Sequence, residues 1–239
     1  MIEQAASGSA LARLVNRWPG IAVTAGVLRP ELEAVLDGGA ASPPLVRQLA
    51  PMLGWHTADL FVIAGLDLPE DLVPATGTKP WDVGDVLVAA ARLTPQALHR
   101  LRAFVGSLPM HPPTWPPVPP HHSYPLGPGE MLLRLLRNRN IGPYSPKPLH
   151  YIGDGPIVSY STMAMLGPGR TRLTSQYVTA FAATLGIPDA DLSAITGVPA
   201  AAEPRLHRSH AELAGLAWEA RRLTDGQLSQ VLDLATPLH

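Results

Sequence analysis

Four consecutive residues in the second half of the chain carry side-chain hydroxyl groups: Ser159, Tyr160, Ser161 and Thr162. A hydroxyl both donates and accepts hydrogen bonds, so these side chains can bind base edges or phosphate oxygens of a nucleic acid. Met163 follows directly and can contact the methyl group of a thymine. Arg170 and Arg172 come shortly after, and a guanidinium pairs with phosphate through two parallel hydrogen bonds. Hydroxyl groups and arginines so close together indicate a nucleic-acid contact.

The surrounding segment is basic. Residues 130–175 contain six basic and two acidic side chains, a local charge of +4. The basic residues are Arg134, Arg137, Arg139, Lys147, Arg170 and Arg172, and the acidic ones are Glu130 and Asp154. Neutralising about four phosphates predicts a slope of log K against log salt near −3.6. The alternative is that these arginines are ordinary surface charges in contact with water.

The whole chain carries no strong charge. Its 239 residues include 18 basic and 19 acidic side chains, for a net charge of −1. Charged residues make up 15% of the chain, against about 25% in an ordinary soluble domain. Because this balance gives no general attraction toward DNA, any nucleic-acid site must be a local patch.

Several other kinds of site are excluded or unsupported. The chain has no cysteine, so disulfides, thiolate metal sites and cysteine nucleophiles are ruled out. Histidines that could bind zinc lack the spacing and carboxylates of a metal site: His111, His121, His122, His207 and His210. No Walker, dinucleotide-binding or GxSxG motif is present, so we expect neither an enzyme nor a cofactor. No apolar run spans a membrane and no signal peptide is evident, which favours a cytoplasmic protein.

Helical patterns position these residues. Leucines recur on one helix face over residues 45–53. Ser42 and two prolines precede them as a helix start, and Gly54 follows as a typical helix-ending glycine. Thr94 and Pro95 are suited to begin another helix, and residues 224–227 form a capping-box sequence. Alternating β-branched runs are absent. We therefore predict an all-α fold.

The two halves of the chain resemble each other. Residues 45–71 match residues 177–203 at an offset of 132, and residues 85–108 match 215–238 at an offset of 130. This period is too long for a solenoid repeat. It predicts two related domains, residues 1–108 and 130–239.

The segment between the halves, residues 109–129, is rich in proline, with nine prolines in 21 positions. Proline lacks a backbone N–H and cannot continue a helix or a central strand. We interpret this segment as an extended linker. Its PxxP spacing also fits a ligand for a partner's aromatic groove.

The second half resembles the XRE/Cro-type helix-turn-helix domain, in a form frequent in actinobacterial regulators. The resemblance is carried by LLRNRNI (135–141), KPLHYIGDG (147–155), SYSTMAMLGPGRTRLT (159–174) and VTAFAATLGIPDADLSAITGV (178–198). It implies an all-α domain that binds double-stranded DNA as a dimer or a tandem pair, with residues 159–166 as the recognition helix. The DNA-binding residues so implied are Arg139, Lys147, Ser159, Tyr160, Ser161, Thr162, Met163, Arg170 and Arg172.

The first half departs from this pattern. Its candidate recognition segment, residues 27–39, contains Glu31, Glu33 and Asp37 against the single Arg29. Acidic side chains facing phosphates weaken binding, so we expect a degenerate copy that serves dimerisation or holds a partner. Alternatively, it contacts a second half-site through shape rather than through bases.

Helix pairs predicted at residues 82–108 and 212–238 trail the two helix-turn-helix units. Their leucine stripes exceed what two short helices can bury alone. Three arrangements remain open: each pair packs on its own unit, forms a dimer seam, or docks the two halves together.

The sequence thus predicts an all-α protein of two duplicated helix-turn-helix domains, each with a trailing helical hairpin. The expected function is transcription regulation through DNA read mainly by the second domain, with a homodimer possible. The alternative is a non-catalytic adaptor that has lost DNA binding and holds a protein partner through its first domain or its linker.

Overall fold

The computed structural model describes residues 9–21, 29–74, 83–110, 126–142 and 146–236. Every regular element in these ranges is helical, which confirms the all-α prediction. None of the helices described there is both long and apolar enough to cross a bilayer. Most of the proline-rich linker lies outside the described residues.

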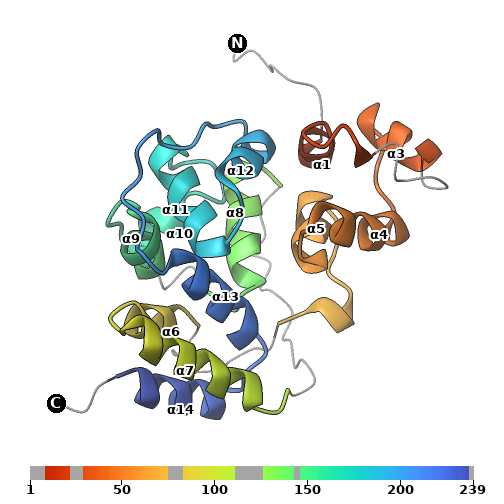
Figure 1. Ribbon diagram of the computed structural model, residues 1–239. Helices are drawn as coiled ribbons and strands as arrows, with labels where there is room; N and C mark the ends of the chain where they lie inside the picture. Colours follow the sequence, from red (N-terminus) through yellow and green to blue (C-terminus); the bar gives the residue numbers. More distant parts are fainter. Residues whose placement is uncertain (1–8, 22–28, 75–82, 111–125, 143–145, 237–239) are drawn as a thin grey trace.

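The first half contributes α1 (Ala10–Val15), α3 (Arg29–Leu36), α4 (Pro43–Leu53), α5 (Thr57–Ile63), the 3-10 turn η2 (Glu70–Leu72), α6 (Val83–Ala90) and α7 (Pro95–Ser107). The second half contributes α8 (Pro128–Arg137), α9 (Lys147–Gly153), α10 (Tyr160–Ala164), α11 (Ser175–Leu185), α12 (Asp189–Thr196), α13 (His210–Ala220) and α14 (Asp225–Ala235). Figure 1 shows α1, α3, α4 and α5 as one group and α8 to α12 as another, with α6, α7 and α14 below.

The helix boundaries follow the predicted capping residues. The hydroxyl of Ser42 accepts the backbone N–H of Leu45 at the start of α4, and Thr94 caps α7 in the same way. Thr224 and Gln227 form the predicted capping box of α14. Gly54 ends α4 in the left-handed conformation, with φ of 69°, which a glycine adopts without steric cost.

The helices recur at the offsets of the sequence repeat. Helices α4 and α11 begin 132 residues apart, and so do α5 and α12. Helices α7 and α14 begin 130 residues apart. The repeated sequence is therefore also a repeated order of helices.

The two halves pack on each other throughout. Helix α1 of the first half contacts α12 of the second, and α5 of the first contacts α8 of the second. The helix pair α6–α7 packs on α13 and α14, with α6 also against α9, as the lower layer of Figure 1 shows. Buried apolar side chains from both halves form a single cluster. The trailing helix pairs therefore dock the halves together. Because α13 also packs on α11 of its own half, the second pair combines this arrangement with packing on its own unit.

An arginine from each half pairs with an aspartate of the other half. The helices α1 and α8 each end at an asparagine that an arginine follows, giving Asn16-Arg17 and Asn138-Arg139. Arg17 contacts Asp191 of α12 at 2.7 Å, and Arg139 contacts Asp59 of α5 at 2.8 Å. Since Asp59 and Asp191 occupy the third position of matching helices, the contact is reciprocal, as at a two-fold interface.

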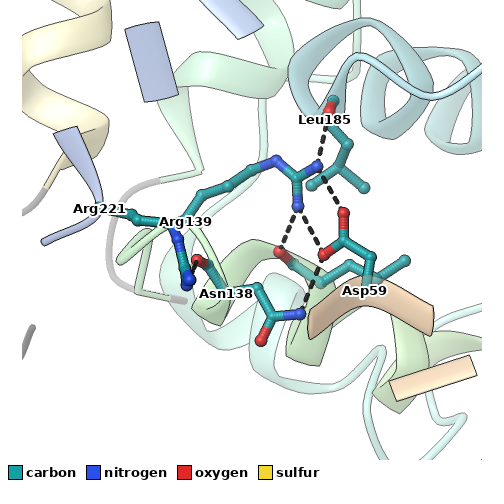
Figure 2. Close-up of polar contacts among 6 residues, drawn as sticks. Asp59, Asn138, Arg139, Leu185 and Arg221 are labelled. Atoms are coloured by element: carbon teal, nitrogen blue, oxygen red, sulfur yellow. Dashed lines mark hydrogen bonds and ion pairs between the residues drawn. The ribbon is translucent and has the colours of Figure 1, made fainter. Parts of the chain in front are cut away.

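The Arg139–Asp59 pair is the centre of the junction (Figure 2). Both side chains are 1% exposed. The guanidinium donates two hydrogen bonds to the Asp59 carboxylate, at 3.0 and 2.8 Å, and two more to the carbonyls of Leu135 and Leu185. Asn138 Nδ2 donates a further bond to Asp59 Oδ1 at 2.9 Å. Because a buried charge is tolerated only when it is paired and hydrogen-bonded, this network holds α5, α8 and α11 in one arrangement.

Trp218 of α13 lies beside this junction. The ring of His56 stacks on it with 3.5 Å between centroids and an interplanar angle of 5°. The Arg221 guanidinium lies 4.1 Å from the Trp218 ring centroid, a cation–π distance, and donates hydrogen bonds to the carbonyls of Leu72 and Asn138. Burial lowers the pKa of Arg221 to about 10, so it stays charged at neutral pH. Arg221 thereby ties α13 to the first half of the chain.

The stack on Trp218 makes stability depend on pH. His56 keeps an exposed edge, but the loss of water from its covered ring face lowers its pKa below the usual value. Asp59 opposes this shift, and the charges of Arg139 and Arg221 add to it. The unfolded chain then binds the proton more readily, so stability falls as pH drops through about 6.5 toward the folded-state pKa. We expect a lower melting temperature at pH 5.5 than at pH 7.5.

The variant His56→Phe keeps an aromatic ring on Trp218 and removes the titrating group. We expect the fall in melting temperature between pH 7.5 and pH 5.5 to be smaller in this variant than in the wild type. Differential scanning calorimetry at the two pH values checks this. An unchanged pH dependence in His56→Phe would assign the effect to other groups.

Candidate nucleic-acid interface

The turn between α9 and α10 is held by backbone and side-chain hydrogen bonds. Asp154 follows α9 with φ of 56°, a left-handed conformation that reverses the chain direction. The N–H of Gly155 then donates to the carbonyl of Leu149 at 2.9 Å. The ring of His150 lies within hydrogen-bonding distance, 2.9 Å, of the Gly155 carbonyl. These bonds place α10 at a defined angle to α9.

Two glycines allow α9 to approach α11 closely. A Cβ atom at Gly153 would lie 2.5 Å from the Cα of Ala180, and one at Gly155 would lie 2.7 Å from the Cβ of Ala180. At Gly153 the neighbouring atoms belong to the backbone and cannot move aside as a flexible side chain can. The close contact between α9 and α11 therefore requires glycine, at Gly153 above all.

Helix α10 presents its first turn to solvent. The hydroxyl of Ser159 accepts the backbone N–H of Thr162 at 3.3 Å and lies 2.8 Å from the Ser161 hydroxyl. The hydroxyl of Thr171 donates to the carbonyl of Thr162, which fixes the segment after α10 against the helix. Ser159, Tyr160 and Ser161 are exposed, and Thr162 is half-buried. The predicted hydroxyl run therefore lies at the surface.

Fewer basic side chains of residues 130–175 are exposed than the sequence predicted. Lys147, Arg170 and Arg172 are exposed, and no ion pair involves them among the residues that the structure describes. Lys147 opposes the rise that burial causes in the pKa of Asp85, so it lies close enough to α6 to interact with that carboxyl group.

Two of the predicted DNA contacts are wrong. Arg139 is completely buried and its charge is neutralised by Asp59. Met163 is also 0% exposed and packs in the hydrophobic core, where it anchors α10. Neither side chain can reach a ligand outside the protein. Arg139 binds Asp59 and Met163 packs in the core, so both contact the fold itself rather than DNA.

Two further arginines of the basic segment are held within the fold. Arg134 Nε and Arg137 Nη1 each donate to Glu130 Oε1 at 3.0 Å. The Glu130 side chain is completely buried. Because Arg139 is neutralised as well, three of the six basic groups in residues 130–175 remain exposed. The acidic Asp154 of the same stretch is half-buried.

Exposed apolar side chains, which the sequence reasoning did not select, lie on the same segment. Ile157 in the turn is 83% exposed and Tyr151 of α9 is 45% exposed. The sequence offered one sign that Ile157 is exposed, because this residue stands in a short turn between Pro156 and the capping residue Ser159. Residues 147–172 thus include exposed hydroxyl groups, exposed cations and exposed large apolar groups.

The segment of the first half that was predicted as its recognition segment forms α3 and differs from α10 in charge. In α3 the carboxylate of Glu31 accepts the backbone N–H of Ser42 at 3.1 Å. Arg29 lies 3.8 Å from Glu33 on the exposed side of the helix. Glu31 therefore has a structural role, and Arg29, the single basic side chain of α3, is already paired. Within the described ranges, no three His, Asp or Glu side chains are grouped so as to hold a metal ion.

The chain matches no known family model, no curated protein and no solved structure.

Proposed function

We propose that the protein binds double-stranded DNA through α10 and the exposed cations beside it, and that it regulates transcription in the cytoplasm. The observation that carries this proposal is the exposure of Ser159, Tyr160 and Ser161 at the start of α10, with Arg170 and Arg172 exposed just beyond its end. A recognition helix enters the major groove with its N-terminal residues, which supply hydrogen bonds to bases. Arginines at the rim bind the phosphates and orient the protein.

The helix order supports a helix-turn-helix interpretation. Helices α9 and α10 are joined by a short turn and packed against α11 through α9, as a positioning helix and a recognition helix are in such motifs. We propose that α3, α4 and α5 belong to a second, related unit. The reciprocal Arg17–Asp191 and Arg139–Asp59 pairs would then join two units of one chain as subunits are joined in a dimer.

The first unit is proposed to contribute shape rather than base contacts. Its exposed α3 residues include Glu33 beside Arg29, so the helix offers a phosphate no net positive charge. In contrast, α5 holds the second unit through the buried Asp59–Arg139 pair, and Arg17, which follows α1, pairs with Asp191 at a partly exposed position. This division of roles fits a degenerate copy retained for structure.

Salt dependence tests the proposal. Three exposed cations, Lys147, Arg170 and Arg172, predict a slope of log K against log salt of about −2.7, since each neutralised phosphate contributes about −0.9. The variant Arg170→Ala/Arg172→Ala removes two of them, so we expect the slope to shrink to about −0.9 and the affinity to fall at every salt concentration. Fluorescence anisotropy with a pool of random-sequence duplexes, from 25 to 200 mM salt, measures both quantities.

A matched control removes the same charge elsewhere. Arg100 is exposed on α7, outside the candidate surface, and Arg100→Ala should leave the slope unchanged. Circular dichroism and melting temperature verify that each variant is folded. Absence of binding by the wild type at 25 mM salt, or an equal loss in Arg100→Ala, would reject DNA binding through this surface.

A protein-binding adaptor is the second candidate function. It is favoured by Tyr151, Ile157 and Tyr160, which are exposed on the α9–α10 segment. Exposed apolar side chains grouped on one surface are typical of protein interfaces. If the wild type fails to bind DNA at low salt, this surface becomes the site at which to seek a protein partner.

A further inference from the structure

The turn between α9 and α10 presents one apolar side chain to solvent. Ile157 is 83% exposed, more than any other large apolar side chain of the residues that the structure describes. A single exposed apolar residue is ordinary on a protein surface, so its exposure alone does not indicate a contact. Ile157 is distinguished by how the chain holds it and by the residues that lie next to it.

The chain is held on both sides of Ile157. Before it, the N–H of Gly155 donates to the carbonyl of Leu149 at 2.9 Å. After it, Val158 packs against the hydrophobic core, and Ser159 caps α10 through its hydroxyl group. Val158 thus faces the core while its neighbour Ile157 faces solvent. Because the flanking residues are already fixed, ordering Ile157 against a ligand costs little further conformational entropy.

The residues that follow Ile157 in the chain are compatible with a DNA contact. No aspartate or glutamate occurs from residue 155 to residue 188, and the charged side chains there are Arg170 and Arg172. The exposed hydroxyl group of Ser159 stands two positions after Ile157. In the major groove, thymine offers the acceptor O4 beside its C5-methyl group. A hydroxyl group and an apolar group so close together therefore match the edge of this base.

The thymine contact expected from the sequence, Met163, is completely buried and cannot reach DNA. We propose that Ile157 takes this role and contacts the C5-methyl group of a thymine, so that the protein prefers duplexes with thymine at that position. The contact removes apolar surface from water, and adenine, guanine and cytosine carry no methyl group to replace it. This inference rests on the proposed binding of DNA through α10 and names a base that the surface selects.

Replacement of thymine by uracil tests the proposal, because uracil lacks the methyl group and keeps every hydrogen-bonding group of the base. Duplexes are first selected from a random pool by binding to the wild-type protein. The selected duplex is then prepared with uracil in place of each thymine in turn. At the contacted position we expect the affinity to fall about fourfold, the factor that corresponds to one buried methyl-sized group. Fluorescence anisotropy measures each affinity.

Three variants assign the effect to Ile157. Ile157→Ser should bind the thymine duplex about fourfold more weakly than the wild type does, and should no longer distinguish it from the uracil duplex. Ile157→Val keeps a branched apolar side chain and should retain most of the preference. The matched control is Leu234→Ser, at a leucine of α14 that is 58% exposed, and it should change neither affinity. Circular dichroism verifies that each variant is folded.

The outcomes distinguish this proposal from the proposed function. The role of Ile157 is overturned, with DNA binding intact, if the selected duplexes contain no thymine or if no uracil substitution weakens binding. It is overturned equally if the preference for thymine persists in Ile157→Ser or is lost in Leu234→Ser. Absence of any DNA binding by the wild type at low salt would reject both proposals.

Discussion

Replacement of Asp59 by alanine is expected to lower the free energy of unfolding by about 3–5 kcal/mol. The substitution leaves the completely buried guanidinium of Arg139 without a counterion, and Asn138 Nδ2 loses its acceptor as well. The carbonyls of Leu135 and Leu185 still accept from Arg139, but carbonyl groups do not neutralise a charge. Urea denaturation followed by circular dichroism measures the change as a lower midpoint at an unchanged m-value.

The repeat within the chain supplies the control. Asp191 occupies the matching position in α12, but its partner Arg17 is 40% exposed and can be hydrated when the carboxylate is removed. We therefore expect a clearly smaller loss in Asp191→Ala than in Asp59→Ala. Equal losses in the two variants would contradict the explanation by burial.

A double substitution separates the charge from the packing. Asp59→Leu/Arg139→Met replaces the buried pair with apolar side chains, and such replacements are often neutral or stabilising. We expect this variant to recover most of the stability lost in Asp59→Ala. A double variant as unstable as Asp59→Ala would show that the loss arises from altered packing rather than from the unpaired charge.

Replacement of Gly153 by alanine is expected to cost about 1–3 kcal/mol of stability and to abolish the proposed DNA binding. The new Cβ atom would lie 2.5 Å from the Cα of Ala180 and 2.7 Å from its carbonyl oxygen, so α9 must move away from α11. Helix α10 is attached to α9 by a hydrogen-bonded turn, and it moves with it. Thermal denaturation and the anisotropy assay measure the two effects.

A glycine in open space provides the comparison. Gly106 lies in α7, and a Cβ atom added there would have no heavy atom of another segment within 4 Å. Gly106→Ala should leave DNA binding unchanged and raise stability by up to about 1 kcal/mol, because alanine favours a helix over glycine. Similar behaviour of the two variants would mean that the close approach of α9 to α11 is not required.

Local features of the fold were accessible from the sequence. Ser42, Thr94 and the 224–227 capping box begin helices as predicted, and Gly54 ends one. These predictions succeed because a cap depends on hydrogen bonds between residues three or four positions apart. The order of helices also follows the offset of the repeat, since similar local sequences form similar helices.

The charges were predicted less well. Arg134, Arg137 and Arg139 were counted as part of a basic surface, but all three bind carboxylates within the fold. The i, i+4 spacing of Glu130 and Arg134 was a usable signal. Arg139 offered none, because its partner Asp59 lies 80 positions away in the chain. The Asp-Leu repeat at Asp59 and Asp191 was visible in the sequence, but not its role in joining the halves.

The sequence by itself determined that the chain is helical, where several of its helices begin and end, and that their order is repeated. Only the tertiary structure decided which cations face solvent, that Met163 is buried, and that α6 and α7 pack on the second half. The physical reason is the separation along the chain between the residues that interact. Helix formation and capping are set by neighbours along the chain, whereas burial and ion pairing are set by whichever distant surface packs against a residue.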